Sequence, residues 1–285
     1  MRALVVLAEL WAASEIILLA ARKEGDAALY GLLGLFLLAC CALTYRVTFP
    51  PRSARDGALT RQLLPIQIAL LLLLVALTGW TVALQAHALA SAPPLWQSFH
   101  RHLTLWIGAM TPQALGPALV NFAELAIVPL IVLAVLRVPL TKMGLGGFTR
   151  GSGAAAAIWL LLPMLAIAYL ILYADTSAAL VGQRLIYSFF ASGFSQEFLF
   201  RGALFGRLRA LMPAQWAAFS QALLFGIWHF GSDVAHGHGV VTALALIVPA
   251  QASFGFAMAI LVRRTGNLAI PALLHTAIDA IRAIA

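Results

Sequence analysis

Long apolar stretches separated by short polar breaks run along almost the whole chain. Nine of them stand out, near residues 3–21, 27–45, 63–85, 117–136, 154–173, 185–208, 214–230, 240–262 and 267–284. A helix of about 20 apolar residues is long enough to cross the hydrocarbon core of a bilayer. The pattern therefore predicts an all-α fold, a polytopic transmembrane helical bundle of about eight to nine membrane helices.

Three other stretches lie between these apolar segments. Residues 86–102 contain paired prolines, a tryptophan and three histidines, and we interpret them as an interfacial loop. Residues 103–113 are expected to form an interfacial or re-entrant piece. The glycine-rich stretch 141–153 indicates a hinge between an N-terminal helical part and a C-terminal core.

Acidic residues lie inside two apolar segments of the N-terminal half. Glu9 and Glu15 interrupt the first segment, so we expect a retained helix there rather than a cleaved signal peptide. Glu124 lies in the fourth segment, where Asn121, one turn earlier, is its expected partner. We interpret these three carboxylates as structural or lipid-interface groups.

The composition is that of a membrane protein. Of the residues, 62% are hydrophobic and only 10% are charged, whereas soluble domains average about 45–50% and about 25%. The net charge of +8 would suit a nucleic-acid partner, but the basic residues lie at the ends of apolar segments rather than on one binding face. The expected partner is the lipid bilayer, with no nucleic acid.

The basic residues also predict an orientation. They gather in alternate loops, after the second, fourth, sixth and eighth apolar segments: Arg46, Arg52, Arg55, Arg61, Arg137, Lys142, Arg150, Arg207, Arg209, Arg263 and Arg264. Short loops rich in lysine and arginine face the cytoplasm. We therefore expect a multi-pass protein of the plasma (inner) membrane with its N-terminus in the cytoplasm.

Polar residues at helical spacing lie inside three apolar segments of the C-terminal half: Gln196 and Glu197 with Arg201, Phe225 with His229, and His275 with Asp279. An Asp, Lys or Arg at the centre of a bilayer costs ~2.5–3.5 kcal/mol on the insertion scale, so such residues are functional candidates. Residues four apart share one helix face. At 1.5 Å per residue the ionisable groups lie ~13–24 Å above the cytoplasmic helix ends, so they can meet. The pattern predicts one buried polar chamber, an intramembrane active site.

The chamber holds groups that peptide hydrolysis needs. A base must activate water, and donors must stabilise the oxyanion. Glu197 or His229 can serve as the base, while His275 and Asp279 can orient each other or line the oxyanion site. Taken singly, Glu197 with Arg201 is also a common helix-stabilising ion pair, and a lone buried histidine is more often structural than catalytic. A zinc site would need His229 and His275 with a carboxylate, but no H-E-x-x-H motif is present, and we expect neither a metal nor a cofactor.

The three motifs resemble those of the CPBP family, the type II CAAX-prenyl endopeptidase and bacteriocin-processing group of intramembrane glutamic proteases. The family pattern is E-E-x-x-x-R-G on one helix, F-x-x-x-H on the next, and H-x-x-x-N or H-x-x-x-D on the last. This chain offers Q-E-F-L-F-R-G (Gln196–Gly202), F-G-I-W-H (Phe225–His229) and H-T-A-I-D (His275–Asp279). The resemblance covers about residues 150–285. It implies N-terminal transmembrane helices at 1–150 and a protease core at 151–285.

One position departs from the family pattern. The family's first glutamate, generally taken as the base that activates water, is Gln196 here, and an amide cannot accept that proton. Three interpretations stay open: a natural enzyme that uses Glu197 or His229 as its base, a catalytically silent relative, and a variant made inactive by substitution.

The resemblance implies a metal-independent intramembrane endopeptidase that processes a membrane-embedded or lipid-anchored peptide or protein, with Gln196 impairing the reaction. It assigns the catalytic site to Gln196, Glu197, Arg201, His229, His275 and Asp279. The alternative is a non-catalytic relative that holds a hydrophobic peptide or a partner helix. A transporter would be indicated by broken helices in paired halves, and the sequence shows no such internal symmetry.

Overall fold

Helices make up the regular structure of the described chain. The computed structural model describes residues 2–21, 23–49, 58–85, 91, 93–235 and 239–284. Within these ranges the only pairing of the β type is an isolated bridge between Leu145 and Asn267. The all-α prediction is confirmed. Arg52, Arg55 and part of the stretch 86–102 lie outside the described residues.

Six helices of the described chain are long and apolar enough to cross a membrane: Arg2–Ala20, Gly25–Val47, Leu64–Leu84, Gly116–Val135, Ser152–Tyr173 and Val240–Thr265. They indicate a multi-pass membrane protein. The segments predicted near 185–208, 214–230 and 267–284 are also helical but are not among these six. The last of them, α15 (Ala269–Arg282), has 14 residues and spans only about 21 Å, whereas the hydrocarbon core is about 30 Å thick.

The chain divides into two compact units, the first of which contains residues 1–43, 56–92 and 204–260. Its helices are α1 (Arg2–Ala20), most of α2 (Glu24–Val47), α3 (Ala58–Gln62), α4 (Leu64–Gln85), α11 (Phe205–Leu211), α12 (Ala214–Ala235), α13 (Val240–Leu246), the π-helical η5 (Ile247–Ala252) and the first part of α14 (Ser253–Thr265). Within this unit, α12 packs against both α4 and η5.

Close packing fixes α12, the helix of the F-x-x-x-H motif. A Cβ atom on Gly226 would lie 2.7 Å from the carbonyl oxygen of Ile247, so only glycine allows α12 to approach η5 this closely. Small residues play this role at many contacts between membrane helices. On the side of α4, the indole of Trp228 donates a hydrogen bond to Thr78 Oγ1 at 3.1 Å.

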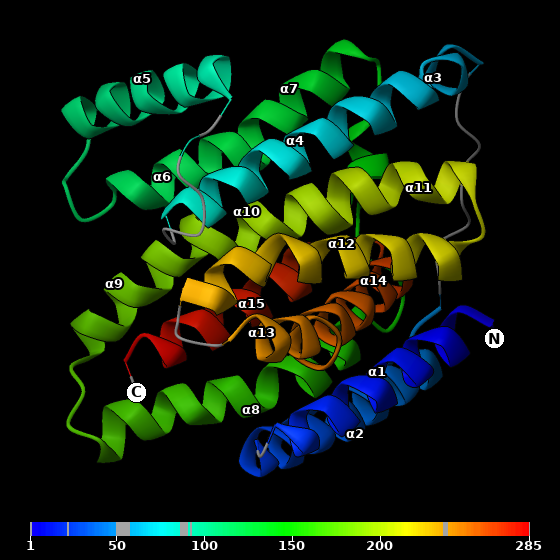
Figure 1. Cartoon of the computed structure of the whole chain (residues 1–285), viewed down its shortest axis with the longest axis vertical. Coiled ribbons are helices and arrows are strands. Elements are labelled where there is room, and N and C mark those ends of the chain that lie inside the picture. The colour runs from blue at the N-terminus through cyan, green and yellow to red at the C-terminus, as the bar shows by residue number, and fades with distance from the viewer. Residues whose placement is uncertain are drawn as a thin grey trace. The chain divides into compact units, whose positions relative to one another are not determined.

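The second unit contains residues 44–55, 93–203 and 261–285. Its helices are α5 (Pro94–Met110), α6 (Gly116–Phe122), η1 (Ala123–Ile127), α7 (Val128–Val135), η2 (Leu140–Met143), α8 (Ser152–Tyr173), α9 (Ala178–Ser188), η3 (Phe189–Gly193), α10 (Phe194–Glu197), most of η4 (Phe198–Leu204), and α15. Of these, η1, η3 and η4 are π-helical. The helix α15 packs against α8, α9, η3 and α10. The labels of α8, α9, α10 and α15 can be followed in Figure 1.

The glycine-rich stretch 141–153 is bonded to the residues that lead into α15. The amide of Leu268 donates to the carbonyl oxygen of Gly144 at 2.9 Å, and the amide of Thr149 donates to that of Thr265 at 3.0 Å. Gly144 has a φ of 74°, which favours glycine. The stretch therefore supports the start of α15, and its role as a hinge stays a prediction.

A helix, α5, occupies residues that the sequence assigned to a loop. Pro94 lies in its first turn, where a missing amide proton leaves no hydrogen bond unmade. Apolar side chains recur along one face, with Trp96 and Ile107 buried. The loop prediction for residues 94–102 is therefore wrong, because the proline pair begins a helix instead of preventing one. The helix α5 packs against α6 and is not among the six candidate spans.

Glu124 has a different partner from the one expected. Its buried carboxylate lies 2.8 Å from Nδ1 of His100 on α5. Asn121 Nδ2 instead donates to the carbonyl oxygen of Ala191 in η3, at 3.2 Å. The predicted Asn121–Glu124 pair is wrong, because the helix is π-helical at Glu124 and the residues that share a face differ from those of an α-helix.

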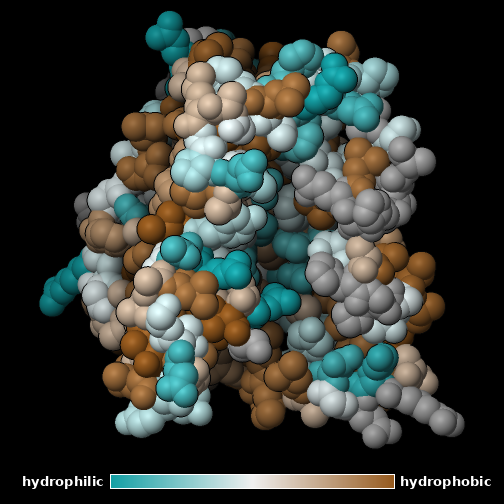
Figure 2. Space-filling model, turned by 90° about the vertical axis from the view of Figure 1, so that its left-hand side faces the viewer, coloured by the Kyte–Doolittle hydropathy of each residue, from teal (hydrophilic) through white to brown (hydrophobic). Residues whose placement is uncertain are grey.

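Large hydrophobic side chains cover much of α8. Six of them are more than half exposed: Leu161, Leu162, Leu165, Tyr169, Leu172 and Tyr173. Figure 2 shows hydrophobic side chains over much of the face that it draws. Soluble monomers rarely expose apolar patches of this extent, so this surface suits contact with lipid.

Candidate active site

The motif Q-E-F-L-F-R-G begins in a short α-helix and continues into a π-helical segment of the same helical stretch. The segment η3 precedes α10, which carries Gln196 and Glu197, and η4 follows with Arg201. Single-turn π-helical segments inside α-helices occur frequently at functional sites. They also change the direction of side chains in a way that hydropathy does not reveal.

Glu197 and Arg201 form an ion pair in the interior. Arg201 Nη1 lies 3.3 Å from Glu197 Oε1, and both side chains are fully buried. The pairing expected from the i,i+4 spacing is therefore present. Removing one member of a buried pair leaves the other charge uncompensated, so each of the two side chains depends on the other.

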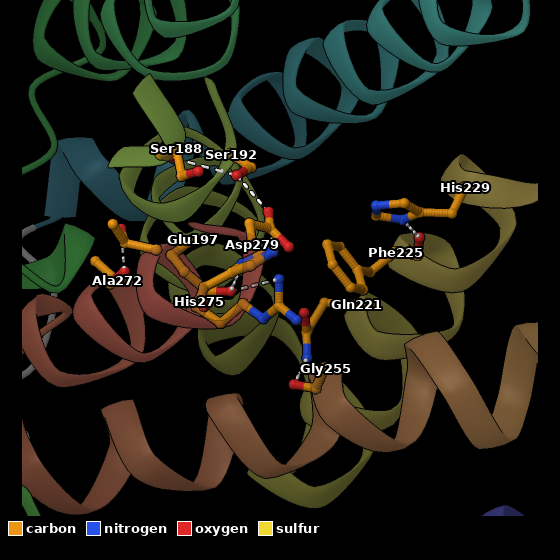
Figure 3. Close-up of polar contacts among 12 residues, drawn as sticks. Ser188, Ser192, Glu197, Gln221, Phe225, His229, Gly255, Ala272, His275 and Asp279 are labelled. Atoms are coloured by element: carbon orange, nitrogen blue, oxygen red, sulfur yellow. Dashed lines mark hydrogen bonds and ion pairs between the residues drawn. The ribbon is translucent and has the colours of Figure 1, made fainter. Parts of the chain in front are cut away.

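His275 brings α15 to the same carboxylate. Its Nδ1 lies 2.9 Å from Glu197 Oε1, and since a carboxylate oxygen accepts, the ring nitrogen donates. Figure 3 shows the two side chains joined by this contact. Glu197 Oε1 thus accepts a hydrogen bond from His275 and forms an ion pair with Arg201. The buried Oε2 has no hydrogen-bond partner in the described part of the chain.

Asp279 extends this arrangement to a residue that sequence reasoning missed. Its Oδ2 lies 3.5 Å from His275 Nε2 and 2.5 Å from the hydroxyl oxygen of Ser192 on η3. Ser192, Asp279, His275 and Glu197 therefore form a polar row, which can be followed in Figure 3. The position of Ser192 four residues before Gln196 could have marked it as a candidate.

Glycine allows α15 to approach η3 closely enough for the polar row to form. A Cβ atom on Gly193 would collide with the hydroxyl of Thr276 and would lie 3.0 Å from the carbonyl oxygen of Ala272. Both of these residues belong to α15, where they lie one turn apart and face η3. The short distance between Ser192 and Asp279 therefore depends on the absence of a side chain at position 193.

Gln196 is buried beside Glu197. Its side chain is 8% exposed, and its Oε1 has no hydrogen-bond partner among the described residues. Buried polar atoms without partners are rare in proteins, and a catalytic role is one of the reasons for which they occur. The amide therefore stands where a polar group of a substrate or a water molecule can be bound.

His229 belongs to the first unit, and its predicted meeting with the polar row stays a prediction. Its Nδ1 lies 2.8 Å from the carbonyl oxygen of Phe225, and its ring contacts those of Phe225 and Trp228 at centroid distances of 4.5 Å and 4.8 Å. Since a carbonyl oxygen only accepts, we assign the proton to Nδ1, which makes Nε2 the acceptor of the neutral ring. The F-x-x-x-H spacing thus favours a tautomer that can accept a proton.

A hydrophobic groove of ≈ 350 Å³ lies in the second unit, between residues of α8, α9, η3 and α15. It is lined by Leu160, Met164, Leu185, Ile186, Phe189, Phe190, Leu273, Thr276 and Ala277. Thr276 follows His275 directly in α15. A hydrophobic group in this groove would therefore contact α15, the helix that carries His275 and Asp279. In the described ranges, no three His, Cys, Asp or Glu side chains are grouped so that they could hold a metal ion.

Residues 178–281 match the sequence model of one protein family, described as type II CAAX prenyl endopeptidase Rce1-like. The matched region contains all three motifs and confirms the resemblance to the CPBP family. It does not include residues 1–177. The comparisons with curated proteins and with solved structures found no match.

Proposed function

We propose that this membrane protein, in which residues 178–281 match the Rce1-like type II CAAX prenyl endopeptidase family, is an intramembrane, metal-independent endopeptidase of the glutamic type. One observation carries the proposal: in a buried site inside the matched region, Glu197 Oε1 forms an ion pair with Arg201 and accepts a hydrogen bond from His275 Nδ1. The proposed substrate is a membrane-embedded or lipid-anchored peptide or protein.

In the proposed reaction, water adds to the peptide carbonyl carbon and gives its proton to a base. The resulting oxyanion accepts hydrogen bonds from donors of the site, and the C–N bond breaks as the proton passes to the leaving amine. Glu197 holds Arg201 and His275 in place for this work. The base of the family stands at position 196, where Gln196 cannot take a proton, so the groups left for this role are Glu197 Oε2 and His229 Nε2.

The hydrophobic groove supports a membrane-associated substrate. Its lining is apolar along α8, α9 and η3, and it reaches α15 at Thr276, next to His275. An apolar anchor held there would place the attached peptide near the polar row. Holding the substrate beside the reacting groups lowers the entropic part of the barrier.

A second function, binding without catalysis, is favoured by Gln196 itself. The amide keeps the size of a glutamate and leaves a buried acceptor for a peptide N–H, but it removes the base. Such a protein would hold a hydrophobic peptide or a partner helix and release it unchanged.

The decisive experiment compares the unmodified chain with Gln196→Glu after reconstitution in liposomes that carry a fluorogenic, lipid-anchored peptide. We expect Gln196→Glu to cleave at least about tenfold faster, because a positioned base contributes ~10²–10⁴-fold. His275→Ala in the same background serves as the inactive control. Peptide binding without cleavage by either protein would favour the second function. Equal and rapid cleavage by both proteins would mean that Glu197 or His229 is the base.

We also propose a bundle of eight to nine membrane helices in the plasma (inner) membrane, with N-terminal helices at 1–150 and the protease core at 151–285. The six candidate spans and the alternate basic loops support this arrangement, with the N-terminus in the cytoplasm. A reporter fused in the basic loop near Lys142 is expected to report a cytoplasmic position. A signal from the opposite side would reverse the orientation.

A further inference from the structure

Ser192 lies outside the three motifs but contacts a residue of the last one. Its Oγ is 2.5 Å from Asp279 Oδ2 and 3.1 Å from the carbonyl oxygen of Ser188, one turn earlier. A serine hydroxyl has a single proton, and an ionised carboxylate is a stronger acceptor than a carbonyl oxygen. The hydroxyl therefore donates mainly to Asp279, which lies on a different helix.

The π-helical segment η3 directs Ser192 toward the site. Ser192 and Glu197 are five residues apart, and in an uninterrupted α-helix their side chains would point about 140° away from each other. In η3 the hydrogen bonds run between residues five apart, as from the amide of Phe194 to the carbonyl oxygen of Phe189. Residues at this spacing come closer to one face in such a segment, so Ser192 and Glu197 both reach α15.

One oxygen of Asp279 faces both Ser192 and His275. The Oδ2 atom lies 2.5 Å from Ser192 Oγ and 3.5 Å from His275 Nε2, while Nδ1 of the same imidazole donates to Glu197. The carboxylate oxygen that faces the imidazole is therefore also held by the buried hydroxyl of Ser192. A shift of Asp279 would change the orientation of the ring.

We propose that Ser192 is a positioning residue of this site: its hydroxyl holds the Asp279 carboxylate in place, and Asp279 keeps the His275 imidazole directed at Glu197. The inference rests on the proposed endopeptidase function and adds a residue that none of the motifs contains. Ser192 acts through Asp279 and has no role in the bond changes themselves.

Ser195 offers a matched control on the same helical stretch. It is fully buried, and its Oγ donates to the main-chain oxygen of Phe190 at 2.5 Å. Among the described residues it makes no hydrogen bond with a carboxylate. Ser195→Ala therefore removes another buried serine hydroxyl, one that makes no hydrogen bond with the polar row in the described part of the chain.

The test uses the full chain in liposomes with the lipid-anchored peptide. The parent for all variants is the unmodified chain or Gln196→Glu, whichever cleaves faster. Ser192→Ala is expected to lower kcat about tenfold with KM unchanged, because a misplacement of about 1 Å can cost up to ~10²-fold. Ser192→Thr keeps the hydroxyl and is expected to restore cleavage, while Ser195→Ala cleaves at the parent rate. In the Asp279→Ala background, Ser192→Ala should cause no further loss of cleavage, because the effects of substitutions at residues that act as a unit are not additive.

Three results would overturn the role of Ser192 and leave the proposed function intact: parent-rate cleavage by Ser192→Ala, an equal loss in Ser195→Ala, or a full further loss in the Asp279→Ala background. Absence of cleavage by both the unmodified chain and Gln196→Glu is a different result. It would overturn the endopeptidase function itself, and the positioning role with it.

Discussion

Glu197 Oε1 lies 2.9 Å from His275 Nδ1, although 78 residues separate the two in the chain. The same oxygen is 3.3 Å from Arg201 Nη1 on its own helical stretch. One carboxylate atom thus joins a contact within a motif to a contact between two helices. The stability of the second unit and the geometry of the site should therefore depend on the same atoms.

Replacing Arg201 should destabilise the protein as well as reduce its activity. Arg201→Ala leaves the buried Glu197 carboxylate without its cationic partner, and breaking a buried pair in this way costs about 3–5 kcal/mol. Thermal unfolding in detergent and the yield of folded protein would measure the loss. Arg184→Ala, at an exposed position of α9, is the control and should unfold like the parent. An equally stable and abundant Arg201→Ala protein would show that the fold does not need the pair.

A methyl group at position 193 should push α15 away from η3. Gly193→Ala would bring a Cβ atom to 2.9 Å from the amide nitrogen of Thr276 and onto its hydroxyl, and backbone atoms cannot turn aside as a flexible side chain can. We expect a loss of about 1–3 kcal/mol of unfolding free energy, as for other overpacked sites, together with slower peptide cleavage.

The matched change for this prediction is Gly182→Ala on α9. A Cβ atom there would meet nothing within 4 Å, and alanine is favoured over glycine in a helix by about 1 kcal/mol. Gly182→Ala should therefore be neutral or stabilising. Equal melting temperatures for the two glycine variants would argue against a tight contact between η3 and α15.

Hydropathy was sufficient to locate most helices, because a run of some twenty apolar residues has few alternatives to a helix in a bilayer. The segment predicted at 154–173 is the helix Ser152–Tyr173. Hydropathy did not locate α5, because the proline pair at its start and its two histidines weaken the apolar signal. Helices nevertheless tolerate a proline at the position of Pro94.

Contacts within a motif were predictable, whereas most contacts between helices were not. The spacing of Glu197 and Arg201 alone implies their pairing. Ser192 and Asp279 are 87 residues apart, and their contact depends on a π-helical segment that a period of 3.6 residues does not reveal. Likewise, the sequence placed the partner of Glu124 on the same helix, at Asn121, whereas the partner in the structure is His100 on α5.

The contact between α5 and α6 should weaken as the pH rises. The hydrogen bond to Glu124 raises the pKa of His100 above its ordinary value of 6.5, and burial opposes this shift. A group whose pKa is raised on folding stabilises the fold fully below its unfolded pKa and loses that effect as the pH rises through the folded pKa. We therefore expect α5 to be held firmly below pH 6.5 and to open more readily at alkaline pH. Hydrogen exchange of the α5 amides, corrected for the intrinsic pH dependence of exchange, measures this opening.

Two histidines of α5 separate this effect from general changes with pH. His100→Gln should abolish the pH dependence of opening. His102 is exposed, and its Nδ1 contacts the carbonyl oxygen of Ser98 in the same helix, so His102→Gln should retain the pH dependence. If His100→Gln opened with the same pH profile as the parent, the pair with Glu124 would not be what holds α5.

Moving the carboxylate by one residue tests what Glu197 does. The double variant Gln196→Glu/Glu197→Gln has the same composition and charge as the chain itself, so any change reports position alone. Neighbouring residues on a helix point about 100° apart, and the transferred carboxylate should therefore miss Arg201 Nη1 and His275 Nδ1. We expect the double variant to cleave no lipid-anchored peptide and to unfold as easily as Arg201→Ala.

Gln196→Glu alone should cleave at least about tenfold faster than the unmodified chain, and Glu197→Gln alone should abolish whatever cleavage the unmodified chain shows. Cleavage by the double variant at the rate of Gln196→Glu would mean that Arg201 and His275 do their work without Glu197, and that the buried contact between η3, α10 and α15 serves the fold alone.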